Sequence, residues 1–142
     1  MGSGLTTLTG DIATSGAVDL RGTNRTMTFD LVDRTIDTTS RLGNGAITLG
    51  TTNSAYGLTL SSGSGTISLK GVGVSGDGMD ATSLASLTLR GTGTTNLEGS
   101  IITFGSVDLK GTSRTTHVTS SQIIGTGAEA LLIGDINLSD GV

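Results

Sequence analysis

Residues 65–71 read Gly-Thr-Ile-Ser-Leu-Lys-Gly, so that apolar and small polar side chains alternate between two glycines. Alternation with a period of two is typical of a half-buried β-strand, and glycine is suited to the turns on either side. The pattern recurs at a constant spacing without slippage, in TMTFD (26–30), AITLG (46–50), SLTLR (86–90) and SVDLK (106–110). A looser second set follows about half a period later, at Leu58, Leu60, Met79, Leu97 and Val118.

The short, fixed period predicts the fold. It is too short for a propeller blade, and no helical stripe or leucine-rich consensus is present. We therefore predict an all-β parallel β-helix, or β-solenoid, with about 20 residues per coil. Two interior columns of side chains then replace the aromatic core that a chain with 2% aromatic residues cannot build. They are Met27, Ile47, Ile67, Leu87 and Val107, and Phe29, Leu49, Leu69, Leu89 and Leu109.

One eleven-residue unit occurs twice, as GAVDLRGTNRT (16–26) and GSVDLKGTSRT (105–115). The offset between the two copies is not a whole number of repeats, so we expect an insertion between them. Residues 31–44 carry an unusual cluster of charges and are predicted to be a surface loop or an irregular coil. If so, Met27 and Phe29 belong to the second strand set and only four rows of the repeat remain.

The 142 residues are predicted to form a single β-solenoid segment, 1–142, cut from a longer repeat array. Residues 1–4, Met-Gly-Ser-Gly, look like an artificial leader, and no signal peptide follows them. The net charge of −4 argues against nucleic acid as a partner. No apolar run is long enough to span a membrane. The absence of cysteine excludes disulfides and cysteine-based metal sites.

Residues that carry chemistry are sparse. His117 is the single histidine and is predicted to face solvent from a strand, and the acidic residues are scattered. We therefore expect no enzyme activity and no catalytic or cofactor-binding residues. The one cofactor considered is Ca²⁺, because residues 76–80 form one imperfect copy of a calcium-binding β-roll repeat, which normally needs several aligned copies.

Two surface columns are candidate sites. A cationic column of Lys70, Arg90 and Lys110 keeps other strands off the rod or contacts an anionic glycan, and the first interpretation is favoured. A column of small hydroxyl side chains suits ice in its geometry, although Ala46 and Asp108 interrupt it, and an ordinary solenoid surface is the preferred interpretation. Its members are Thr26, Thr28, Thr48, Thr66, Ser68, Ser86 and Thr88.

The phrases LTGDIATSGAVDL, GNGAITL, GSGTISLKG and GDINLSDG resemble the repeat regions of large bacterial secreted exoproteins. They are similar to filamentous-haemagglutinin adhesins of two-partner secretion and to autotransporter passenger domains. The resemblance implies a right-handed parallel β-helix, export through an outer-membrane partner, and adhesion. The secretion signal and the membrane barrel of those families have no counterpart in the sequence given, so no residue here inherits a role in export.

The expected function is therefore a structural stalk and adhesion segment of a secreted or cell-surface bacterial exoprotein. Its expected partners are a host or neighbouring-cell surface, including glycans, and other copies of itself joined end to end. The alternative is a binding module for an anionic polysaccharide or for ice. A third interpretation is a trimeric fibre in which three chains share the solenoid.

Overall fold

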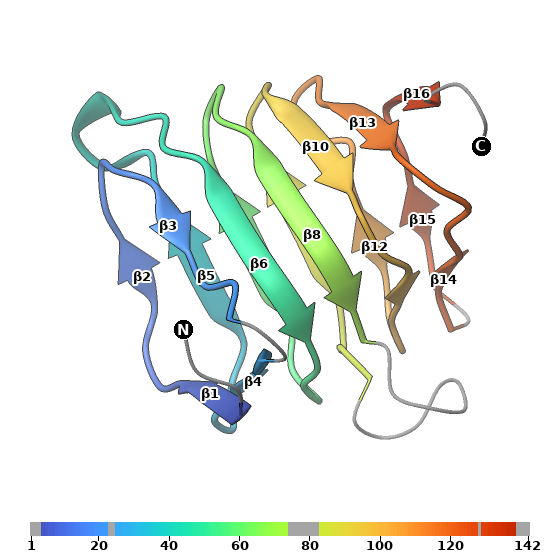
Figure 1. The fold of residues 1–142 in the computed structure, drawn as a ribbon, viewed down its shortest axis with the longest axis horizontal. Helices are drawn as coiled ribbons and strands as arrows, with labels where there is room; N and C mark the ends of the chain where they lie inside the picture. Colours follow the sequence, from blue (N-terminus) through green and yellow to red (C-terminus); the bar gives the residue numbers. More distant parts are fainter. Residues whose placement is uncertain (1–3, 23–24, 74–82, 128, 139–142) are drawn as a thin grey trace.

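The chain forms a β-solenoid of parallel strands in the computed structural model, which describes residues 4–22, 25–73, 83–127 and 129–138. The solenoid has about five turns, roughly 23 residues apart. One 3-10 turn, η1 (Ser40–Leu42), is the only helical element in these ranges. The all-β parallel solenoid predicted from the repeat is confirmed, with a longer mean coil (Figure 1).

The strands form two sheets that face each other, and every pair among the described strands is parallel. Figure 1 shows strands of the large sheet, such as β6 and β8, lying in front of strands of the small sheet. The large sheet contains β1 (Gly4–Leu8), β3 (Val18–Asp19), β4 (Arg25–Phe29), β6 (Ile47–Thr52), β8 (Ile67–Val72), β10 (Thr94–Leu97), β11 (Ile101–Ile102), β13 (Thr115–Val118), β14 (Ile124–Gly125) and β16 (Asp135–Leu138). The small sheet contains β2 (Ile12–Ala13), β5 (Arg34–Asp37), β7 (Leu58–Ser61), β9 (Leu87–Arg90), β12 (Val107–Asp108) and β15 (Leu131–Leu132).

The large sheet carries two tracks, which are rows of strands paired from one coil to the next. The first track includes β3 and β10, and the second includes β4 and β11. Ile47 at the start of β6 pairs with β3, whereas Thr51 near its end pairs with β4. In the same way, Ile67 at the start of β8 pairs with β10, and Val72 at its end pairs with β11. Together with the small sheet, the two tracks therefore give three places in each coil where the chain can pair in parallel with the next coil.

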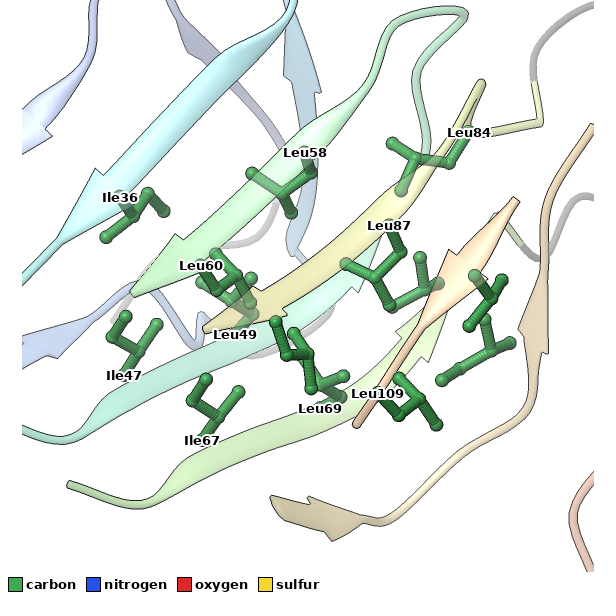
Figure 2. Packing of buried hydrophobic residues seen from close by; sticks show 14 of the residues in the cluster. Ile36, Ile47, Leu49, Leu58, Leu60, Ile67, Leu69, Leu84, Leu87 and Leu109 are labelled. Carbon is green, nitrogen blue, oxygen red and sulfur yellow. The ribbon is translucent and has the colours of Figure 1, made fainter. Parts of the chain in front are cut away.

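The core lies between the sheets and is almost entirely aliphatic. All ten residues predicted for the interior columns are buried, from Ile47 at 0% to Phe29 at 5% exposure. Figure 2 shows Ile47 and Ile67 on neighbouring strands, with Leu58 and Leu87 on strands of the other sheet. Burial of a Leu or Ile side chain stabilises the fold by about 1.5–3 kcal/mol, so these columns supply the main stabilising term.

The predicted columns are nevertheless wrong in their register. Ile47 and Ile67 are neighbours in the large sheet, but Leu87 and Val107 are neighbours in the small sheet. Met27 pairs with Thr52 and not with Ile47. The reason is that coil length varies, because the step from Leu60 to its partner Leu89 is longer than the step from Ile47 to Ile67. Counting residues at one constant spacing therefore leads from a residue of the large sheet to a residue of the small sheet.

The segment 31–44 is not the loop that its charges suggested. It contributes β5, whose Ile36 is fully buried and pairs with Ile12 on one side and Leu60 on the other. Asp33, Arg34 and Asp37 lie at or beside the ends of β5, and Arg41 lies in η1. Asp37 Oδ1 accepts hydrogen bonds from the backbone N–H and hydroxyl of Thr39. The remainder of the segment is turn-like, with Leu42 in a left-handed conformation (φ 63°) and 96% exposed.

The two copies of the duplicated unit lie at different places in the coil and share the hydrogen bond that begins the bend after the strand. The Val-Asp pair forms β3 in the large sheet in the first copy and β12 in the small sheet in the second. In both, the aspartate accepts a backbone hydrogen bond two residues later, from Arg21 to Asp19 and from Lys110 to Asp108, each 2.9 Å. The position of the unit in the sequence therefore does not mark one phase of the coil.

The arginine near the end of the second copy, Arg114, lies inside the solenoid and is 1% exposed. Its five N–H groups all find neutral oxygen acceptors. Nε donates to Thr95 Oγ1 (3.1 Å), and Nη1 to Ser62 Oγ (3.0 Å) and Arg90 O (3.1 Å). Nη2 donates to Gly65 O (3.1 Å) and Thr94 O (2.7 Å). The guanidinium thus bridges segments that are far apart in the sequence, and burial lowers the pKa of Arg114.

Candidate functional site

The cationic column predicted from the sequence is divided between the two sheets. Arg90 and Lys110 are exposed in neighbouring coils of the small sheet, because β9 and β12 pair through Leu87 and Val107. Lys70 belongs to β8 of the large sheet, where the register places it next to Glu98. Since β7 pairs with β9, the small-sheet column continues through Ser61 to Asp37 and so mixes charges of both signs.

The predicted hydroxyl column is also divided. Thr48, Thr66 and Ser68 lie in or beside the first track of the large sheet. Ser86 and Thr88 lie in or beside the small sheet, and Thr26 and Thr28 belong to β4 in the second track. The variable coil length separates them, so the seven residues do not form one array, and Thr88 instead lies in register with Thr59 and Thr35. The outward column that contains Thr48 and Ser68 runs through Asp19, Thr48, Ser68, Asn96, His117 and Asn137.

His117 lies on the outward side of β13, as the sequence predicted. Its neighbours Thr116 and Val118 are buried, at 0% and 9% exposure, while His117 itself is partly exposed. The register places it between Asn96 and Asn137 of the adjacent coils. Its surroundings in the column are therefore neutral amides, with no carboxylate directly in register.

A hollow with a volume of about 670 Å³ lies where the chain enters the small sheet. Three successive coils contribute to it, through the residues that precede β9, β12 and β15. Phe104 forms one wall and is 64% exposed. The lining residues are Ala85, Ser86, Phe104, Gly105, Ser106, Gly127 and Glu129.

The floor of this hollow depends on glycine. A Cβ atom at Gly105 would lie 2.2 Å from the carbonyl oxygen of Ala85, and one at Gly127 would lie 2.1 Å from that of Phe104. Both distances are far below van der Waals contact, so the successive coils can approach this closely only without side chains at these positions. The close approach of successive coils at this hollow therefore depends on Gly105 and Gly127.

A second, smaller hollow of about 370 Å³ lies beside β4. Tyr56 and Phe29 contribute aromatic surface to it, together with Leu5, Thr26, Thr28, Asn53, Ser54 and Ala55. Ser54 is 4% exposed, and its hydroxyl has no hydrogen-bond partner within the described residues. Each of the three aromatic residues of the chain therefore lines one of these two hollows.

Sequence reasoning missed both of these hollows. The available signal was the position of Phe104, an aromatic residue directly before the turn glycine Gly105 in a chain with only two Phe and one Tyr. The predicted repeat does place Ala85 beside Gly105 and Ser86 beside Ser106, but Gly127 and Glu129 follow a longer step to the next coil, which the repeat does not predict.

The described residues hold no group of three or more His, Cys, Asp or Glu side chains placed to share a metal ion. The calcium-like motif at residues 76–80, and Met79 of the second strand set, lie outside the described residues. Within the described part of the chain, no helix has the length and apolar character needed to cross a membrane.

In comparisons with known proteins, no family model, no curated protein and no solved structure matches this chain.

Proposed function

We propose that this chain is a rigid shaft segment of a secreted or cell-surface bacterial exoprotein, and that it serves adhesion by carrying surface features on a stiff support. The observation that supports the proposal is the unbroken parallel pairing from coil to coil, from β1 to β16 in the large sheet. Such pairing resists bending because each coil is bonded to the next along its sheets.

The chemistry of the surface agrees with a solvated shaft. The outward columns consist mainly of Thr, Ser, Asn and single charges of both signs, and the aliphatic side chains on strands β6 to β10 are buried, whereas Leu31, Leu42 and Ile123 between strands are exposed. The resemblance of the repeats to those of filamentous-haemagglutinin-like exoproteins supports the same function and the extracellular location.

The alternative of a binding module for a polyanion or for ice has less support, because the columns on which it depended are divided between sheets. Arg90 and Lys110 remain adjacent, but Ser61 and Asp37 continue their column. A binding function has better support at the hollow beside Phe104, where an aromatic ring is exposed.

Deletion of one whole coil tests whether the chain is a shaft built from stacked coils. Ile12 and Ile36 are in register, so excision of residues 12–35 joins equivalent positions and spares every hydrogen-bond partner of Arg114. We expect a folded protein that is shorter by about 4.8 Å in small-angle scattering. Excision of only residues 24–35, which is out of phase, should lose the fold. Equal tolerance of both deletions would contradict the coil register.

Adhesion is tested with beads that carry the chain. Beads coated with the folded protein should attach to animal-cell or bacterial layers more than beads coated with Leu60→Asp, because Leu60 is fully buried and its replacement unfolds the solenoid. Equal attachment of the two bead types, or no attachment by either, would refute the adhesive function.

A further inference from the structure

We infer that the hollow beside Phe104 is a binding site for a neutral saccharide unit, which makes it the contact through which the proposed adhesion operates. The inference rests on the proposed function and specifies its ligand class. The volume of the hollow, about 670 Å³, falls within the range of roughly 300–1,000 Å³ that is usual for small-molecule sites.

The wall formed by Phe104 is the first reason. A ring that is 64% exposed forgoes much of the stabilisation that burial gives. Its exposed face is apolar and flat, which matches the apolar C–H face of a pyranose ring. The small residues Ala85, Gly105 and Gly127 leave the space in front of it open.

The polar lining is the second reason. Ser86 and Ser106 provide hydroxyl groups, which both donate and accept hydrogen bonds, and Glu129 provides a carboxylate that accepts them. Sugar hydroxyls need this mixture of donors and acceptors. Hydrogen bonds to a charged acceptor are about twice as strong as neutral ones, so Glu129 is suited to fix the orientation of the ring.

The charge of the lining decides which saccharides are bound. No Lys, Arg or His is among the described residues that line the hollow, and the one ionisable residue there is Glu129. A uronic acid or a sulfated sugar would meet like charge without compensation. The site therefore selects neutral sugars, in contrast to an anionic glycan held by Arg90 and Lys110.

Binding is measured by saturation-transfer NMR and calorimetry with methyl glycosides of neutral hexoses and their oligosaccharides, alongside glucuronic acid and heparin fragments. We expect neutral sugars to bind and acidic ones not to. Phe104→Ala should weaken binding at least tenfold, and Phe104→Leu should weaken it nearly as much, because leucine is apolar but has no flat face. Glu129→Gln should weaken it less.

Ile123→Ala is the matched control, since Ile123 is 66% exposed and does not line the hollow. All variants must retain the circular dichroism and melting curve of the parent. Failure of every neutral sugar to bind, binding unaffected by Phe104→Ala, or preferential binding of acidic sugars would each overturn the site.

If beads adhere but free neutral sugar does not compete, the saccharide site is wrong and the adhesive function stands. If neutral sugars bind and beads do not adhere, the adhesive function is wrong.

Discussion

Replacement of Arg114 by methionine should remove a large part of the stability of the solenoid. Methionine keeps an unbranched, flexible stem in the interior but deprives three carbonyl oxygens and two hydroxyls of their donor. Each buried acceptor left without a partner costs about 1–3 kcal/mol. Ser62 Oγ and Gly65 O keep their bond to each other at 2.8 Å, so the other three acceptors account for most of the loss.

The opposing effect is that the variant no longer buries a charge, which recovers several kcal/mol. Three acceptors at about 1–3 kcal/mol each cost roughly 3–9 kcal/mol, and the recovered desolvation leaves a net loss on the order of 2–4 kcal/mol, a large fraction of the roughly 5–15 kcal/mol that stabilises a typical domain. Urea unfolding followed by circular dichroism measures it as a lower midpoint with an unchanged slope. Arg114→Lys should also be destabilised, because three donors cannot replace five in a fixed fork.

Arg25 is the matched control, because it occupies the same position in the first copy of the eleven-residue unit. It is only partly buried, and its Nη1 donates to Thr6 Oγ1 near the start of the solenoid. Arg25→Met should therefore cost less than half as much as Arg114→Met. A midpoint for Arg114→Met that corresponds to less than about 1 kcal/mol of destabilisation would refute the interior bridge.

Three further predictions concern the core, the glycine floor and an acidic turn. Leu69→Asp and Leu89→Asp should each abolish cooperative unfolding, since either would bury an unpaired charge at a position no more than 1% exposed; a melting transition like that of the parent would contradict this. Gly127→Ala should lower the melting temperature by several degrees, because its Cβ would meet Phe104 O at 2.1 Å, whereas Gly10→Ala, with open space around it, should not. Hydrogen bonds from Thr39 lower the pKa of Asp37, so its contribution to stability is present above the unfolded pKa of about 3.9 and is lost as the pH falls through the folded value; Asp37→Asn should flatten that part of the pH–stability curve, and an unchanged curve would count against the turn.

The strand pattern was sufficient to predict the ten interior side chains of the repeat, but it predicted only some of their neighbours, such as Ile47 with Ile67. Alternation placed Ile47 and Leu89 correctly inside, because the period of two depends only on the local strand geometry. Neighbours across coils depend on the number of turn residues, which the strand pattern does not encode. The pair formed by Ile67 and Thr95 joins an isoleucine to a threonine and gives no hydrophobic signal of register.

The residues at the hollow and at the interior bridge were unpredictable for a related reason. Arg114 stands in the polar stretch GTSRT, which reads as an exposed turn, and its burial depends on acceptors in Ser62 and Gly65 far upstream. Phe104 lies where residues of three coils meet. In both cases the decisive contacts are non-local, and the local strand pattern does not encode them.

The tolerance of this solenoid for coils of unequal length has an evolutionary consequence. Neighbouring strands stay paired although the step between them varies, as the pairs of Ile47 with Ile67 and of Leu60 with Leu89 show. Both Leu60 and Leu89 stay buried despite the longer step between them. Natural selection can therefore lengthen or trim one bend at a time, so that such a molecule can diversify its exterior rapidly while its scaffold is inherited unchanged.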